Sequence, residues 1–89
     1  MNKYVITYDL IDADGDYQGL YDRLSNFPEA VKLTESVWMI KTKLTADDVV
    51  ETLKNSVHCG IRLTVSNAPG LRTFNDLSSQ LEFNNFFAS

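Results

Sequence analysis

The stretch KYVITYD, residues 3–9, is rich in β-branched and aromatic side chains, a composition typical of a β-strand. Successive side chains of a strand point to opposite faces of a sheet, so positions 4, 6 and 8 face one way and positions 5, 7 and 9 the other. Both sets contain apolar residues. This strand therefore requires later elements to cover both of its faces.

An amphipathic helix is expected next, from about Asp16 to Phe27, because Leu20, Leu24 and Phe27 follow one another at helical spacings. Asp16 is expected to cap its start. Residues 29–43 then have the pattern of a β-hairpin with its turn near Glu35.

The clearest helix pattern is LTADDVVETLKNSV, residues 44–57. Thr45 is expected to cap it, with Asp48 in the capping-box position three residues later. Gly60 is expected to stop this helix. A last strand is expected over residues 61–66.

The order strand, helix, strand, strand, helix, strand predicts an α+β fold of the ferredoxin-like βαββαβ type, a four-stranded antiparallel sheet with both helices on one face. Residues 1–89 are expected to form a single domain, with a core over 3–66 and a C-terminal docking segment over 67–89. The apolar side chains expected to dock are Leu71, Phe74, Leu77, Leu81, Phe83, Phe86 and Phe87.

The strand VWMI, residues 37–40, is apolar on both sides. Helices on one face would leave Val5, Val37 and Met39 on the other, to be covered by a second chain or by the C-terminal segment. Large apolar patches on small proteins usually mark interfaces. A homodimer is therefore expected, with these three residues at its interface.

The chain has 8 basic and 12 acidic residues, a net charge of −4, and so lacks the bulk attraction on which non-specific nucleic-acid binding relies. Its single cysteine, Cys59, excludes an internal disulfide and any multi-cysteine metal site. Neither a signal peptide nor a stretch long enough to span a membrane is expected. These features predict a soluble, cytoplasmic protein that does not interact with membranes.

The stretch YDLIDADGDY, residues 8–17, holds four carboxylates: Asp9, Asp12, Asp14 and Asp16. Asp9 ends the first strand and is the candidate ligand for magnesium or manganese, which take oxygen ligands. The alternative is a polar loop that leads into a helix. A calcium loop starting at Asp12 is not expected, because Tyr17 and Arg23 stand where that pattern needs glycine and glutamate.

Other candidate site residues have structural explanations. His58 and Cys59 are adjacent, and neighbouring helix residues point in different directions. Cys59 is expected to be a buried apolar residue. Lys32, Lys41 and Lys43 lie on the hairpin, either as a local basic edge or as protection of an edge strand.

YVITYDL and TESVWMI, an aspartate closing the first strand and Ser-Val-aromatic opening the third, resemble a family of small ferredoxin-like proteins. It includes the SinR-like proteins, the CRISPR-associated endonuclease of the spacer-acquisition complex and the virulence-associated protein D toxins. The resemblance spans roughly residues 3–66 and implies a homodimer. It also implies that Asp9 from both subunits holds a divalent metal, with Ser36 at the family's hydroxyl position.

One departure matters for function. The family's basic cluster at the first helix is replaced here by DADGDYQGLYDR, which is acidic until Arg23. A non-catalytic homodimeric module that binds another protein or acts structurally is therefore the first hypothesis. The alternative is a metal-dependent endonuclease in which Asp9 is catalytic. No bound organic cofactor is expected in either case.

Overall fold

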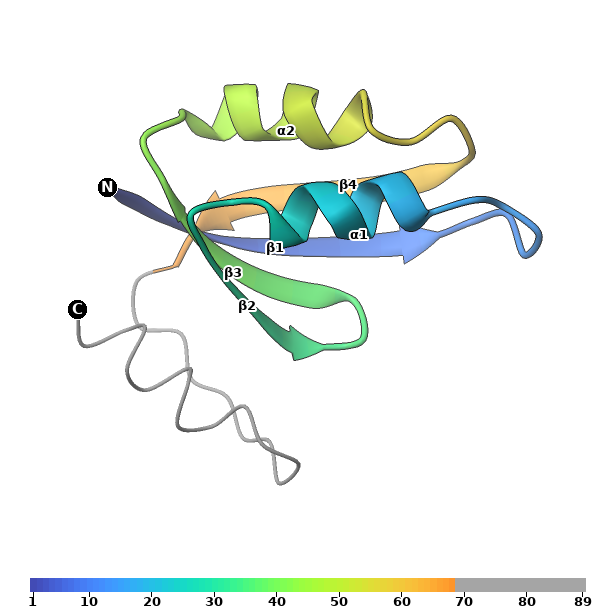
Figure 1. The fold of residues 1–89 in the computed structure, drawn as a ribbon, viewed down its shortest axis with the longest axis horizontal. Helices are drawn as coiled ribbons and strands as arrows, with labels where there is room; N and C mark the ends of the chain where they lie inside the picture. The colour runs from blue at the N-terminus through green and yellow to red at the C-terminus, as the bar shows by residue number, and fades with distance from the viewer. Residues whose placement is uncertain (69–89) are drawn as a thin grey trace.

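The computed structural model describes residues 1–68, and within them the predicted order of elements is observed (Figure 1). The elements are β1 (Asn2–Leu10), α1 (Gln18–Ser25), β2 (Glu29–Thr34), β3 (Val37–Thr42), α2 (Ala46–Lys54) and β4 (Ile61–Asn67). The predicted C-terminal docking segment lies, beyond Ala68, outside the described residues.

The four strands form one sheet in the order β2-β3-β1-β4, and every neighbouring pair is antiparallel. β1 is thus a central strand that pairs with β3 on one side and with β4 on the other. Ile6, for example, lies opposite Trp38 of β3 and Val65 of β4. The α+β prediction is confirmed, and the arrangement is consistent with a ferredoxin-like fold.

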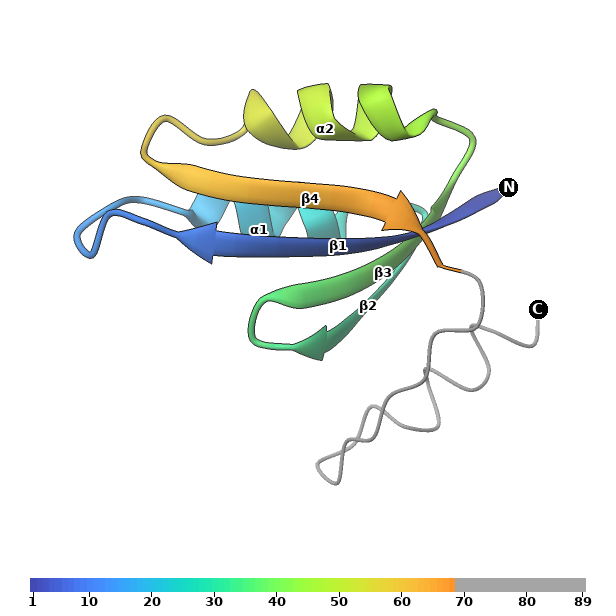
Figure 2. The ribbon, with the colours of Figure 1, turned by 180° about the vertical axis from the view of Figure 1, so that it is seen from behind.

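Both helices lie on the same face of the sheet (Figures 1 and 2). The main core forms between them and the side chains at positions 4, 6 and 8 of β1. The helix residues in this core are fully buried: Leu20, Leu24, Val49 and Leu53. The alternation predicted for the first strand is therefore observed, and its aromatic side is the side that the helices cover.

A second apolar cluster lies on the opposite face of the sheet. It consists of Val31, Leu33, Met39 and Ala68, with Val5 and Val37 packed against it. Residues 1–68 place no helix on this face. Met39 lies between Val5 and Val31 in the strand register and is 0% exposed, whereas Val5 and Val37 are half-buried.

The first helix is shorter than predicted. It runs from Gln18 to Ser25, and its N-cap is Tyr17, which makes no side-chain capping hydrogen bond. Asp16 precedes the cap, although its carboxylate accepts a hydrogen bond of 3.1 Å from the Gln18 amide. Asp16 is therefore not the N-cap that the sequence predicted.

The start of the second helix is as predicted and its end is not. The Thr45 hydroxyl accepts a hydrogen bond of 3.2 Å from the Asp48 amide, which confirms the cap. The helix ends at Lys54 with Asn55 as C-cap, so Gly60 does not stop it. Gly60 instead precedes β4. Neither helix of the described chain is long and apolar enough to cross a membrane.

Helix α1 closely approaches the backbone that follows α2 at Gly19. A β-carbon at this position would lie 2.5 Å from the Ser56 carbonyl oxygen. Glycine is required here because the first turn of α1 passes directly over the backbone that follows α2. This contact fixes the position of the start of α1.

We therefore expect Gly19→Ala to destabilise the protein by about 1–3 kcal/mol through overpacking. Helix propensity alone predicts the opposite sign, since alanine is favoured over glycine by about 1 kcal/mol. Urea unfolding followed by circular dichroism measures the difference. Ser25→Ala, at an exposed position of the same helix, should stay within about 0.5 kcal/mol of the wild type. A more stable Gly19→Ala protein would contradict the close approach.

Candidate functional site

A small hollow of about 130 Å³ lies where β1 ends. The residues that line it come from three places in the sheet: Thr7, Tyr8 and Asp9 of β1, Ser36 of the β2–β3 turn, and Arg62 and Thr64 of β4. The two residues that the family resemblance singled out, Asp9 and Ser36, are therefore brought to one site. We call this site the strand-end hollow.

The strand register explains how the hollow forms. In the pairing of β1 with β4, Asp9 is opposite Arg62 and Thr7 is opposite Thr64. These four side chains belong to the face away from the helices, because Ile6, Tyr8 and Leu63 pack in the main core. Asp9 and Arg62 are exposed.

Ser36 reaches the hollow through the hairpin turn. The Tyr8 amide donates a hydrogen bond of 3.2 Å to the Ser36 carbonyl oxygen. The Tyr8 hydroxyl donates to the Glu35 carbonyl oxygen at 3.1 Å and accepts from the Trp38 indole at 3.2 Å. Burial raises the pKa of this hydroxyl above its usual range. Tyr8 therefore anchors the turn and remains a neutral donor.

The hollow has one carboxylate and one guanidinium, and this charge balance limits its chemistry. Arg62 offers a fork of donors that matches a carboxylate, and it repels a divalent cation beside Asp9. Among residues 1–68, no three histidine, cysteine or acidic side chains are grouped so as to hold a metal ion. Asp9 is thus a single acidic ligand per chain, and the donor set of one chain does not fit a magnesium or manganese site.

Asp12, which follows Asp9 in the acidic stretch, has a structural role. Asp12 is fixed to the start of β4 by its carboxylate, which accepts a hydrogen bond of 2.6 Å from the Gly60 amide. The Tyr17 hydroxyl donates to the Gly60 carbonyl oxygen at 2.6 Å and accepts from the Asp12 amide at 3.0 Å. We call these three residues the loop clasp. The clasp ties the loop between β1 and α1 to the loop between α2 and β4.

Tyr17 connects the loop clasp to the main core. Its ring is buried in the main core while its hydroxyl lies between two loops. Burial raises the pKa of that hydroxyl, and the neighbouring Cys59 thiol raises it further. Tyr17 therefore stays protonated at neutral pH and can donate to Gly60.

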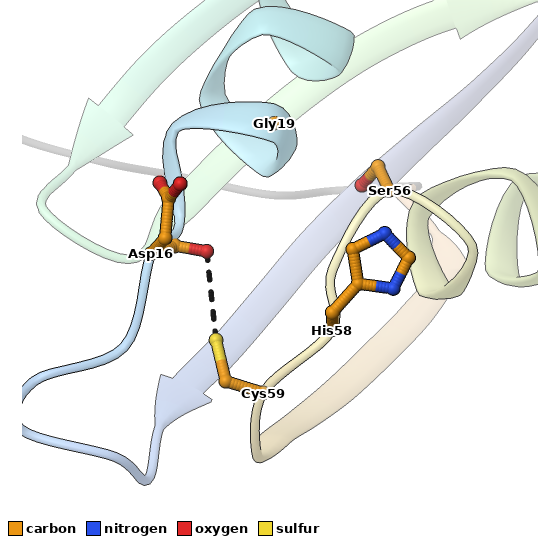
Figure 3. A pocket seen from close by; sticks show the side chains of 5 residues that line it. All are labelled: Asp16, Gly19, Ser56, His58 and Cys59. Carbon is orange, nitrogen blue, oxygen red and sulfur yellow. Dashed lines mark hydrogen bonds between the residues drawn. The ribbon is translucent and has the colours of Figure 1, made fainter.

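A second hollow, of about 460 Å³, is lined by Asp16, Gly19, Ser56, His58 and Cys59 (Figure 3). The Cys59 thiol donates to the backbone carbonyl oxygen of Asp16 at 3.5 Å, and the Asp16 carboxylate points away from it. The His58 ring lies on the Ser56 side of the hollow. Cys59 and His58 therefore do not form a nucleophile and base. Cys59 is half-buried, not fully buried as expected.

The hairpin lysines do not form a joint basic surface. Lys41 is 5% exposed, and its ammonium lies 3.7 Å from a Glu29 carboxylate oxygen. Lys32 lies 3.8 Å from a Glu35 carboxylate oxygen. With two of the three lysines beside carboxylates, this edge offers little attraction for a phosphate backbone.

Sequence reasoning identified Asp9 and Ser36 but missed Arg62 and Thr64. Arg62 and Thr64 could have been found from the alternation in IRLTVS, residues 61–66, which places them on the face of the strand opposite to its apolar side chains. The missing information was the register of β4 on β1. The prediction that Val5, Val37 and Met39 form a dimer interface stays a prediction, with Met39 already buried within the chain.

No family model matches the chain, and neither a curated protein nor a solved structure does so. The resemblance to the SinR-like proteins thus rests on the motifs at the end of β1 and the start of β3.

Removing the Asp12 carboxylate should weaken the loop clasp, because one of its three hydrogen bonds is lost. We expect Asp12→Ala to destabilise the protein by about 1–2 kcal/mol, because the Gly60 amide loses a charged acceptor. Asp14→Ala, an exposed neighbour in the same loop, should change stability by less than about 0.5 kcal/mol. Urea unfolding of both variants measures this. Equal midpoints would contradict a structural role for Asp12.

Proposed function

We propose that the chain is a non-catalytic, homodimeric interaction module of the type that the SinR-like resemblance implies. The observation that carries this proposal is the charge-balanced strand-end hollow, in which Asp9 is matched by Arg62 in the strand register. One acid, one base and flanking hydroxyls suit the recognition of another protein surface. Each chain supplies a single carboxylate there, and the Arg62 guanidinium on the neighbouring strand opposes the binding of a divalent cation.

The face on which the hollow lies supports a partner of protein type. Residues 1–68 leave this face without a helix, and its apolar part borders directly on its polar part. Val37 is opposite Thr7, and Val5 is opposite Ser66. An apolar border next to charged and hydroxyl side chains is the usual composition of a protein interface.

The proposal includes three finer predictions made from the sequence: the fold type, the location and the docking of the C-terminal segment. The domain is a ferredoxin-like module with a cytoplasmic location, and the segment over 67–89 docks on the sheet or on the partner subunit. Ala68 supports the docking, because it is 7% exposed and belongs to the second apolar cluster. The chain therefore leaves β4 on the face away from the helices.

A homodimer predicts a solution mass of about twice the 10.1 kDa chain. Multi-angle light scattering of the full chain, loaded at micromolar concentration and at several dilutions, measures it. The proposal expects the dimer mass at the higher concentrations. A mass of one chain throughout the range would contradict it.

The alternative function is a divalent-metal-dependent endonuclease, and one observation favours it: Asp9 and Ser36 line the same hollow. In that case Asp9 from both subunits would hold magnesium or manganese. The role of the metal would be to activate water and to bind the phosphodiester. The chain's own contribution would be the Asp9 carboxylate and the Ser36 hydroxyl.

Calorimetric titration with magnesium and manganese separates the two functions. The interaction module predicts no saturable binding to the wild type and no cleavage of short RNA or DNA. The endonuclease predicts binding that Asp9→Asn abolishes and that Asp14→Asn, in the neighbouring loop, leaves intact. Binding by the wild type together with cleavage would overturn the non-catalytic proposal.

A further inference from the structure

We call the face of the sheet away from the two helices the open face. On this face, side chains of β1 and β4 lie opposite each other in pairs along the line between the two strands. Asp9 is opposite Arg62, Thr7 is opposite Thr64, and Val5 is opposite Ser66. We call these six residues the β1–β4 seam. Arg62, Thr64 and Ser66 are all exposed, so no residue of the described range 1–68 covers the β4 side of the seam.

We propose that a second copy of this chain docks on the β1–β4 seam, with the Asp9 carboxylate of each copy accepting hydrogen bonds from the Arg62 guanidinium of the other. The inference rests on the proposed homodimer and specifies which surface makes it. A contact between two identical chains about a two-fold axis must be self-complementary, so that residue i meets j and j meets i. The seam has this property, because its two strands carry opposite charges at matching heights.

The geometry follows from the placement of the axis. A two-fold axis that runs along the seam, between two facing sheets, puts β1 of one copy over β4 of the other. Asp9 then faces the partner's Arg62, and Thr7 faces the partner's Thr64. Packed sheets lie about 10 Å apart, a gap that aspartate and arginine side chains bridge from opposite sides.

Charge complementarity selects a second copy over other occupants. A nucleic acid offers only negative phosphates, which Asp9 repels, and the chain itself carries a net charge of −4. A divalent ion is repelled by Arg62. A second copy presents one acid and one base with the required spacing, and such pairs fix the register and the choice of partner. Because each Asp9 carboxylate then faces an Arg62 guanidinium, no metal ion is needed to offset repulsion between the two Asp9 carboxylates.

Charge reversal tests this pairing. In Asp9→Arg, both charged positions of the seam are positive, and in Arg62→Asp both are negative. Each variant alone should have a dimer Kd raised about tenfold or more, because like charges then face each other across the axis. An equimolar mixture of the two variants should form a heterodimer with near wild-type affinity. Sedimentation velocity measures all three samples.

Two sets of controls keep the result interpretable. Glu51→Arg, on the exposed side of α2, changes the net charge as much as Asp9→Arg and should leave the dimer unchanged. Asp9→Asn and Arg62→Gln remove charge without reversing it, so each alone should weaken the dimer. Their mixture should recover part of the affinity, because the heterodimer keeps one of the two Asp9–Arg62 pairs. These neutral variants carry the test if a charge-reversed protein fails to fold, which circular dichroism detects.

The outcomes separate the inference from the proposed function. A wild-type protein that is a monomer removes both. A wild-type dimer whose seam variants, charge-reversed or neutral, dimerise equally well overturns the seam and leaves the homodimer in place. Seam variants that dissociate alone and are not restored by mixing would also overturn reciprocal pairing.

Discussion

The alternation of side chains along β1 is the constraint on which the rest of the structure depends. β1 is paired on both edges, so its side chains can only point toward the helices or away from them. Tyr4, Ile6 and Tyr8 enter the main core, and this placement fixes Asp9 on the opposite face. A slip of one residue would exchange the two sets and bury a carboxylate under the helices.

Three of the four carboxylates in the acidic stretch have different places in the fold. Asp9 belongs to the sheet and is positioned by its pairing with β4. Asp12 lies in the following loop and accepts from the Gly60 amide, and Asp16 accepts from the start of α1. The acidic stretch is thus mainly a device for joining elements, and only its first aspartate is available on the open face of the sheet.

Local sequence patterns predicted the order of elements and the cap of α2. They also predicted that β3 has apolar side chains on both of its faces. The loop clasp was not predictable, since Tyr17 and Gly60 are 43 positions apart and only the folded chain brings them together. The same holds for Arg62, which joins Asp9 through a strand register that side-chain periodicity does not specify. The end of α2 was misjudged because Gly60 lies beyond the C-cap Asn55, directly before β4. A β-carbon on Gly60 would lie 3.2 Å from the Ile11 β-carbon and 3.3 Å from an Asp12 carboxylate oxygen. Glycine at this position therefore leaves room for the loop that follows β1.

The central claim is that two copies meet through the polar part of the open face, and isotope-filtered NMR tests it most directly. A sample that mixes carbon-13-labelled and unlabelled full chains shows only contacts between different copies. The account predicts filtered NOEs between the methyl groups of Thr7 and Thr64, accompanied by contacts from Asp9 to Arg62. Filtered NOEs that involve only α1 and α2, or a complete absence of filtered NOEs at concentrations well above the dimer Kd, would contradict it.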